Sequence, residues 1–377
     1  AFERGYLPDF VTRIGIRQLS AQQLRHCDDA GKAANKGAEA GLAGSQEKLR
    51  ETIQALIDAP VAVCTAEANE QHYEVDARFY GLCLGPHRKY SACFYEGAES
   101  KWPGNKLQRD AAKLLPKAEK DSLDQVAERA DISQATKAIL DVGCGWGSAS
   151  LYFADRFRNA QVVGVSNSHS QRKYIMGQAA ERGLTNLQIV TLDLSKEPLD
   201  KALEALQTRL PGQYFQRGSS IEMFEHMKNY RALFEKITAV LEENGRLFVH
   251  VFCHRQYAYH FVAKSDADWM AKYFFAGGTM PSADLFVHFA ARKDAPIALV
   301  DHWRNSGVHY ALTAEGWLQN MDNNADLVRE ILKEAYPPHE TELWFNRWRA
   351  FYLACVELFG YDGGQEWCIG HYLFEKR

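Results

Sequence analysis

The chain has 377 residues, of which 46% are hydrophobic and 24% charged, and its formal net charge is −4. It is long enough to bury a sizeable core in two domains or one large one, since domains commonly run to about 100–200 residues. It has no evident signal peptide, no basic stripe for nucleic acid, no Lys/Arg cluster for docking on anionic lipid, and no apolar run near the ~18 residues of a membrane span. We therefore expect a cytoplasmic protein with no nucleic-acid partner and no stable membrane insertion.

The eight cysteines are scattered singly along the chain, and no CxxC pair occurs. This pattern is typical of reduced thiols in a cytosolic protein rather than of a disulfide framework or a zinc site. We therefore expect no bound metal.

Residues 1 to about 65 are predicted to be mostly helical. Residues 45–59 carry apolar side chains at helical spacing, and Pro60 stops the pattern. The Ala- and Gly-rich stretch 28–45 is expected to be a loop. Three further segments are expected before the first strand: an aromatic-rich segment at 72–95, an irregular insertion at 99–112 and an amphipathic helix at 114–130.

From residue 138 onward, strands and helices alternate. The strands are expected at 138–141, 161–165, 187–192, 217–221 and 245–252, with helices at 148–157, 170–182 and 229–241. This alternation predicts a parallel sheet covered on both faces. The pattern then breaks into a stretch rich in aromatics, histidines and Gly/Pro turns, which we interpret as a lid over a ligand at the strand ends. The sheet is expected to resume at 367–374.

The most informative motif is ILDVGCGWGS at 139–148. Its short strand ends in Asp141, and Gly143, Gly145 and Gly147 then alternate through a tight turn before a helix. Glycine allows a sharp turn and close approach to a ligand, at the strand end where open α/β sheets bind ligands. The spacing differs from the dinucleotide pattern GxGxxG, and Asp141 would repel a pyrophosphate but attract the ammonium group of an amino-acid-like cofactor. The motif therefore favours S-adenosylmethionine over NAD.

A cluster of acids and a histidine follows the strand expected at 217–221. Glu222 and Glu225 are three positions apart, so one helical turn would put both carboxylates on one face, next to His226. Beside a cationic sulfonium, such a cluster can accept a proton from an amine or hold its ammonium group. A surface turn is the alternative, but the apolar residues on either side favour a buried site, where a carboxylate needs a partner or a proton.

Longer motifs, in order over about four-fifths of the chain, carry a family resemblance. They are HYEVDARFYGLCLGPHRKYSAC (72–93), ILDVGCGWGS (139–148), SIEMFEHMKNY (220–230), LFVHVFCH (247–254), YAYHF (257–261), YFFAGGTMPS (273–282), HYALTAEGWLQNMD (309–322) and ELFGYDGGQEW (357–367). The chain resembles the cyclopropane fatty-acid synthase family of S-adenosylmethionine-dependent methyltransferases. Within that family it looks most similar to the plant coclaurine and pavine N-methyltransferases.

The resemblance implies an α/β fold, with a Rossmann-like class I methyltransferase sheet, an N-terminal helical segment and a helical, aromatic lid insertion. We expect four regions: an N-terminal helical and cofactor-covering part (1–98), a cofactor-binding core (99–253), the substrate lid (254–345), and a C-terminal helix with the return strands of the core (346–377). A homodimer is among the assemblies that we expect.

For S-adenosylmethionine, the glycine turn from Asp141 to Gly147 is expected to hold the methionyl half. The strand at 161–165 ends without the acid that many such enzymes use to bind ribose, and the family shares this absence, so Asn167 and Gln171 are the expected ribose contacts. Asp193 fits the adenine amino group. Two alternatives stay open: Gln171 as an exposed helix residue, and Asp193 as the cap of a following turn.

The resemblance adds residues around the substrate. It implies that Tyr90 and Ser91 fold over the methionine part of the cofactor; without it, Tyr90 would be assigned to the core. The positions that match the amine pocket of the N-methyltransferases are those of the Glu222, Glu225 and His226 cluster, which we expect to be catalytic. Most lid aromatics must pack the core, and those expected to approach the substrate are Tyr259, His260 and Phe275.

The cyclopropane-forming members of the family use the same place differently, because they bind a bicarbonate that takes a proton from a carbocation. The matching positions, identical here and assigned to the substrate pocket, are Cys93, Glu225, His250 and Tyr310. His250 alone could also be an ordinary strand histidine. A small aliphatic neighbour in the synthases is Phe252 here, which would crowd a bicarbonate or a lipid chain.

The leading prediction is therefore N-methylation of a small-molecule amine, benzylisoquinoline-like or a related alkaloid. The alternative is a cyclopropane-fatty-acyl-phospholipid synthase or a lipid C-methyltransferase acting on unsaturated acyl chains. Phe252 and the lack of a basic membrane face favour the amine.

Overall fold

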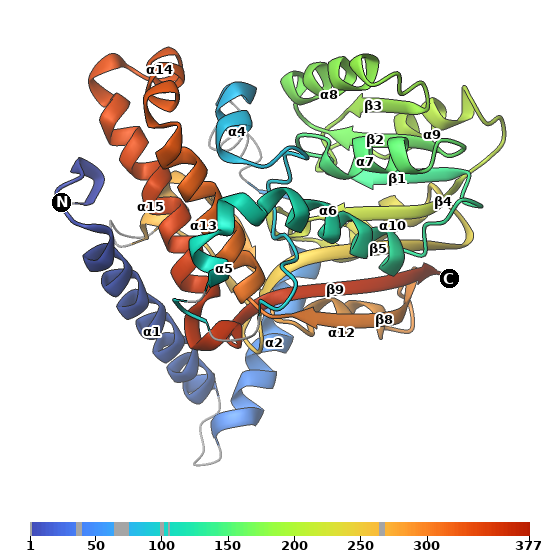
Figure 1. The fold of residues 1–377 in the computed structure, drawn as a ribbon. Helices are drawn as coiled ribbons and strands as arrows, with labels where there is room; N and C mark the ends of the chain where they lie inside the picture. The colour runs from blue at the N-terminus through green and yellow to red at the C-terminus, as the bar shows by residue number, and fades with distance from the viewer. Residues whose placement is uncertain (1, 35–39, 64–74, 99–101, 105, 264–267) are drawn as a thin grey trace.

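The computed structural model of the chain describes residues 2–34, 40–63, 75–98, 102–104, 106–263 and 268–377. A seven-stranded sheet, built from these residues in the order β3-β2-β1-β4-β5-β9-β8, forms the centre of the molecule (Figure 1). Helices cover both of its faces, and a further layer of helices stands beside the ends of the parallel strands. The α/β class I methyltransferase sheet expected from the sequence is confirmed.

The strands begin and end close to the expected positions. They are β1 (Ala138–Val142), β2 (Gln161–Ser166), β3 (Leu187–Thr191), β4 (Phe215–Ile221), β5 (Leu241–His254), β8 (Ile297–Asn305) and β9 (Trp367–Lys376), and a separate pair is formed by β6 (Tyr259–His260) and β7 (Thr279–Met280). Strands β1 to β5 run parallel to one another, whereas β9 lies antiparallel between β5 and β8. The parallel sheet predicted from the alternating strands and helices is confirmed for β1 to β5, but the view that the sheet resumes only at residue 367 was wrong, because β8 lies before it. The missed strand, β8, is a half-exposed edge strand without the continuous apolar run of a buried one.

The helices account for most of the remaining chain. They are α1 (Asp9–Ala34), α2 (Ala40–Asp58), α4 (Ala77–Cys83), α5 (Lys106–Arg109), α6 (Ala111–Arg129), α7 (Ser148–Arg156), α8 (His169–Glu181), α9 (Asp200–Gln207), α10 (Tyr230–Thr238), α11 (Trp269–Tyr273), α12 (Leu285–Ala290), α13 (Val308–Asn323), α14 (Ala325–Ala335) and α15 (Thr341–Phe359). Four 3-10 turns complete the list: η1 (Phe2–Arg4), η2 (Phe224–His226), η3 (Pro338–Glu340) and η4 (Tyr361–Gly364).

Two expectations for the N-terminal third need correction. The loop expected at 28–45 was wrong for the described residues, because α1 continues to Ala34 and α2 begins at Ala40. Alanine has the highest helix propensity, and here it outweighs the local glycines. The insertion at 99–112 is irregular only in part, since it contains α5 and the start of α6. Residues 35–39, Cys64, 72–74, 99–101 and 105 lie outside the described residues.

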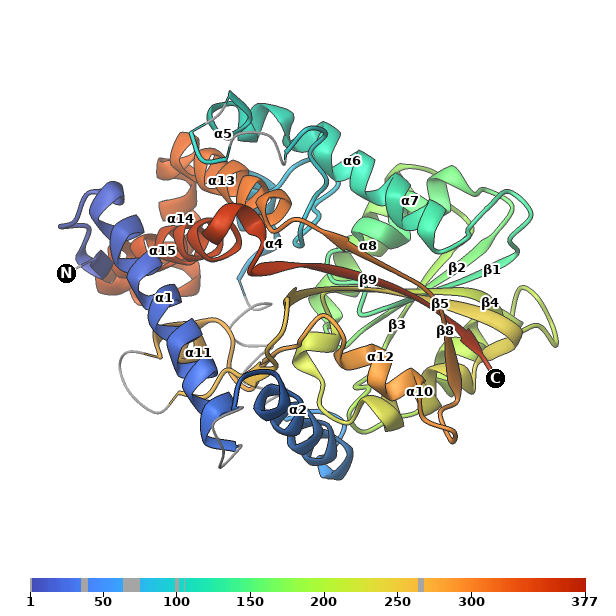
Figure 2. The same cartoon turned by 90° about the horizontal axis from the view of Figure 1, so that it is seen from below.

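Three apolar clusters hold the layers together. One lies between the sheet and helices α6, α7 and α8, and another lies between the opposite face and helices α2, α9, α10 and α12. Figure 2 shows α6, α7 and α8 on one side of the sheet and α2, α10 and α12 on the other. The largest joins α4, α13, α14 and α15 around the fully buried Trp317 and Trp348. In Figure 1 the parallel strands point towards this helical layer, so their carboxyl ends meet it. The candidate site lies at this boundary.

Candidate functional site

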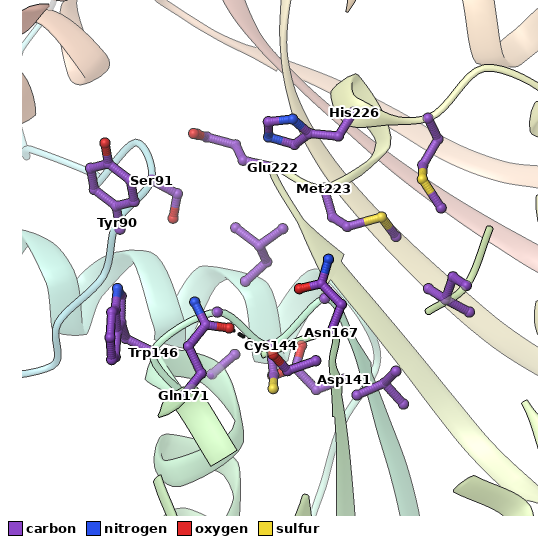
Figure 3. Close-up of a pocket in the computed structure, with 18 of the residues that line it drawn as sticks. Tyr90, Ser91, Asp141, Cys144, Trp146, Asn167, Gln171, Glu222, Met223 and His226 are labelled. Carbon is purple, nitrogen blue, oxygen red and sulfur yellow. Dashed lines mark hydrogen bonds between the residues drawn. The ribbon is translucent and has the colours of Figure 1, made fainter. Parts of the chain in front are cut away.

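A cavity lies at the carboxyl ends of β1 to β4 and is partly covered by residues 88–91 (Figure 3). The predicted site residues that line it are Tyr90, Ser91, Asp141, Gly143, Gly145, Asn167, Gln171, Asp193, Glu222 and His226. Figure 3 places Glu222 and His226 on one side, Asp141 and Gln171 on the opposite side, and Tyr90 with Ser91 on a third. The fold thus brings the two predicted clusters to one cavity.

The turn after β1 needs glycine for two different reasons. All three glycines have a left-handed backbone, with φ of +80° at Gly143, +51° at Gly145 and +81° at Gly147. A Cβ atom on Gly143 would lie 2.4 Å from Cγ of Met223, and one on Gly147 would lie 2.6 Å from Cγ1 of Ile175. A Cβ on Gly145 would meet open space. Gly147 does not line the cavity and instead caps α7.

Asp141 lies at the end of β1 with only 2% of its surface exposed. Its Oδ2 accepts a hydrogen bond from Ser150 at 2.6 Å, and its Oδ1 accepts one from Ser219 at 3.2 Å. Burial nevertheless raises the pKa of this carboxyl to about 6. An ammonium group in the cavity would favour the charged form.

Three buried hydrogen-bond donors of the cavity lining have no partner in the described part of the chain. They are Nε1 of Trp146, Oγ of Ser148 and Nε2 of Gln171. A buried polar group left unpaired costs about 1–3 kcal/mol, so these donors fit a polar ligand in the cavity. Gln171 is 2% exposed, and its Oε1 accepts from Ser166 at 2.7 Å. The alternative of Gln171 as an exposed helix residue is therefore wrong.

Asp193 caps a turn, as the alternative interpretation of this residue predicted, and its contact with adenine stays a prediction. Its Oδ1 accepts from the backbone N–H of Ser195 at 2.9 Å and from the Ser195 hydroxyl at 2.5 Å, so it caps the turn after β3. Lys196 Nζ lies 3.0 Å from Oδ2. The same carboxylate lines the cavity, and Asn167 lies at the exposed rim.

Glu222 is held in place from three sides. Its Oε1 accepts from the backbone N–H of Ala92 at 2.8 Å and lies 3.1 Å from Nε2 of His250, while its Oε2 accepts from the hydroxyl of Tyr310 at 3.0 Å. Its φ of +47° is a left-handed conformation that costs a non-glycine residue about 1–3 kcal/mol. Burial raises its pKa to about 7, against the opposing effect of the Lys89 cation. The result is a buried carboxylate that titrates near neutrality.

Glu225 and His226 point to different places. Glu225 is fully buried away from the cavity lining, and its Oε1 accepts from the backbone N–H of Phe252 at 2.7 Å. Burial, and then Glu222, raise its pKa well above the usual range. His226 lines the cavity, with its ring 4.7 Å from that of Phe275, and burial lowers its pKa to about 4. The two carboxylates do not share a helical face, because Glu222 precedes the turn in a left-handed conformation.

The six residues predicted from the sequence to contact the substrate do not line this cavity themselves. Four of them contact its lining: His250 and Tyr310 through Glu222, Phe275 through His226, and Cys93 through Ser91. Cys93 donates from its Sγ to the carbonyl of Ser91 at 3.5 Å. The last two bond elsewhere. The hydroxyl of Tyr259 accepts from Trp367 at 2.9 Å, and Nδ1 of His260 lies 3.1 Å from Nζ of Lys228.

Sequence analysis did not single out several lining residues, among them Arg88, Lys89 and Trp146. Lys89 is 1% exposed, and its Nζ donates to the Ser91 hydroxyl at 2.7 Å and to the Ala92 carbonyl at 2.6 Å. A lysine beside an arginine in the sequence is normally taken as solvated. The feature of the sequence that could have identified Lys89 as a lining residue was its position directly before Tyr90.

Residues 63–363 match the family model described as mycolic acid cyclopropane synthetase. The chain belongs to this family. It is an S-adenosylmethionine-dependent methyltransferase, which confirms the cofactor and family predicted from the motifs.

Named relatives place the chain near the N-methyltransferases. It is 33% identical to (S)-coclaurine N-methyltransferase of Thalictrum flavum subsp. glaucum over 82% of this chain and 78% of that protein. It is 30% identical to pavine N-methyltransferase of the same plant over 81% of this chain and 78% of that protein. A solved structure of coclaurine N-methyltransferase with N-methylheliamine and S-adenosylhomocysteine has a TM-score of 0.83 and 29% identity, covering 100% of this chain and 97% of that one.

Two further properties of the described residues concern membranes and metal ions. None of the helices described is both long enough and apolar enough to cross a bilayer. Within the same residues, no group of three or more His, Cys, Asp or Glu side chains is placed to hold a metal ion.

Proposed function

We propose that the protein transfers a methyl group from S-adenosylmethionine to the nitrogen of a small-molecule amine, benzylisoquinoline-like or a related alkaloid. The observation that carries this proposal is the buried Glu222 carboxylate, which lines the cofactor cavity and titrates near neutrality. The relatives named above support the same reaction class.

We assign the cofactor to the side of the cavity that holds the glycine turn. When bound, it supplies an electrophilic methyl group on a sulfonium. Asp141 can attract its ammonium group, and the Lys89 cation can attract its carboxylate. The free donor of Gln171, with Asn167 at the rim, suits the ribose hydroxyls, and Asp193 suits the adenine amino group. Tyr90 and Ser91 close the cavity over the methionyl end.

Glu222 and His226 handle the proton and the charge of the amine. An ammonium nitrogen has no lone pair, so the substrate must lose a proton before its nitrogen can attack. A carboxylate with a pKa of about 7 can accept that proton at neutral pH, whereas His226, whose pKa burial lowers to about 4, stays neutral and contributes a hydrogen bond. Glu222 passes that proton on to solvent before the transfer, so its carboxylate is again negative and stabilises the cationic nitrogen that the transfer creates.

Glu225 has a supporting role in this proposal. Its raised pKa keeps its carboxyl protonated, and its hydrogen bond to Phe252 N–H fixes the backbone of β5 behind the site. One proton and one negative charge are thus divided between two neighbouring acids, with the charge on Glu222.

The same geometry argues against the cyclopropane alternative. The resemblance assigns His250 and Tyr310 to a bicarbonate, but here Nε2 of His250 lies within hydrogen-bond distance of the Glu222 carboxylate and the Tyr310 hydroxyl donates to it. A second anion at this place would meet a like charge. Phe252, whose ring centroid lies 5.5 Å from that of Phe275 and 6.4 Å from that of Tyr310, further narrows the space for an acyl chain.

Incubation with methyl-labelled S-adenosylmethionine tests the proposal. The two acceptors are heliamine and vesicles of an unsaturated phospholipid, each with and without added bicarbonate. We expect label on heliamine at a rate that bicarbonate does not change. If only the lipid became labelled, and this labelling stopped when bicarbonate was removed and returned when it was added back, the enzyme would belong to the lipid branch of the family.

A further inference from the structure

A row of hydrogen bonds leads from Glu222 across two strands to α6. Nε2 of His250 lies 3.1 Å from Oε1 of Glu222, and Nδ1 of His250 lies 2.9 Å from Nε2 of His371. Nδ1 of His371 in turn lies 2.6 Å from Nη1 of Arg129. The two histidines are paired directly across β5 and β9 and are 2% and 1% exposed, so the protein alone supplies their partners.

Arg129, the last residue of α6, is fixed by the edge strand β8. Its Nη1 donates to Oδ1 of Asn305 at 3.2 Å, and its guanidinium lies 5.0 Å from the ring centroid of Trp303. Nδ2 of Asn305 donates back to Gln125 of α6 at 2.9 Å. The guanidinium is therefore held in the orientation that meets His371.

The donor at one end gives the whole row a direction. A guanidinium can only donate, so Nδ1 of His371 must accept and its proton must be on Nε2. Nε2–H of His371 therefore donates to Nδ1 of His250. A neutral imidazole has one donor and one acceptor, so Nε2 of His250 carries the proton of that ring. Burial favours this neutral form, since it lowers the pKa of both histidines well below the usual range. The N–H of His250 then points at Glu222, which must accept.

We propose that Arg129 and His371 are positioning residues for the methyl transfer: by fixing the tautomer of His250, they hold the Glu222 carboxylate ionised and oriented towards the amine. This inference rests on the proposed function of Glu222. Without the Arg129 donor, both histidines could reverse their protons, and an acceptor nitrogen would then face Glu222. Such an arrangement favours a protonated Glu222, which cannot accept the proton of the substrate.

Other groups that titrate also face this row, and they are common to every variant considered below. Around Glu222 they are Lys89, Cys93, Glu225, His226, Tyr310 and Cys355. Around His371 they are Lys89 and His309. A change that follows removal of Arg129 alone therefore reports on the row itself.

The first test is the pH dependence of kcat/KM for heliamine in Arg129→Met, compared with Arg129→Lys and Trp303→Leu. Loss of a charge-assisted donor at the end of the row should shift the acid limb of the pH profile upward by about one pH unit, since hydrogen bonds that involve a charged group are stronger than those between neutral groups. Arg129→Met should then be about ten-fold slower at pH 6 and within about two-fold of the wild type at pH 9. Arg129→Lys should restore most of the profile, and Trp303→Leu, which loosens the same corner but keeps the donor, should not shift it. An equal loss at every pH in Arg129→Met would show a merely structural role and overturn the proposal.

The second test needs no turnover. Long-range ¹H–¹⁵N spectra of the full chain with ¹⁵N-labelled histidine distinguish the two neutral tautomers, and His250→Gln and His371→Gln assign the two signals. We expect both histidines to be neutral with the proton on Nε2. A proton on Nδ1 of either would contradict the inference, even if heliamine is methylated. If heliamine is not methylated, the proposed function fails while the spectra still decide the direction of the row.

Discussion

Replacing Glu222 with glutamine removes its charge and its ability to take a proton while keeping its shape. The amide oxygen can still accept from one of Ala92, His250 and Tyr310, which now hold the carboxylate at 2.8–3.1 Å. A general base is worth about 10²–10⁴-fold, so we expect kcat/KM for heliamine to fall by about 10²–10³-fold, or about 2.7–4 kcal/mol of transition-state stabilisation. Affinity for S-adenosylhomocysteine, measured by calorimetry, should change by less than about three-fold, because the proposed cofactor contacts Asp141 and Gln171 lie on the opposite side of the cavity.

The matched control is Glu225→Gln, which lies three residues further along the same segment. The pKa of Glu225 is raised well above its usual range, so its carboxyl is already neutral, and glutamine can keep the hydrogen bond to Phe252 N–H. We expect a loss of less than about five-fold, far below that of general-base removal. Equal losses in the two variants would refute the division of charge between these acids, and a fully active Glu222→Gln would refute the role of Glu222.

Three further outcomes follow from the same geometry. The rate with heliamine should rise with pH through about 7, because Glu222 accepts a proton only when ionised and its pKa is about 7; a rate that is flat from pH 5.5 to 8.5 would contradict this. Gln171→Leu should weaken S-adenosylhomocysteine binding about ten-fold in calorimetry, since its Nε2 loses a ligand hydrogen bond worth about 1.4 kcal/mol; unchanged affinity would exclude this contact. Gly147→Ala should lower the free energy of unfolding in urea by about 1–3 kcal/mol, because φ is +81° and the new Cβ would lie 2.6 Å from Ile175. Unchanged stability would show that α8, which carries Ile175, can move away at no cost in free energy.

The parts of the fold that the sequence revealed are those with a strong local signal. The parallel strands β1 and β2 are short apolar runs between turn residues, and the alternating glycines after β1 mark a turn whose backbone is left-handed at all three positions. The helix α6 was found from its apolar periodicity. These signals do not depend on distant contacts.

The parts that the sequence did not reveal depend on such contacts. Nothing in the segment itself shows that Glu222 adopts a positive φ, which separates its carboxylate from that of Glu225. The Gln171 side chain is buried where Ser166 of the preceding strand donates a hydrogen bond to it. The row from Arg129 to Glu222 joins residues from four separate segments of the chain. Tertiary packing of this kind leaves no local pattern to read.

The most direct test of the central claim identifies the atom that receives the methyl group. The enzyme is incubated with heliamine and S-adenosylmethionine carrying a ¹³C-labelled methyl group, and the product is examined by NMR and mass spectrometry. We predict a single new ¹³C signal at the chemical shift of an N-methyl group, coupled to the carbons beside the nitrogen. A methyl group on carbon or oxygen of heliamine, or no transfer to heliamine while an unsaturated phospholipid gains a methylene bridge, would contradict the account.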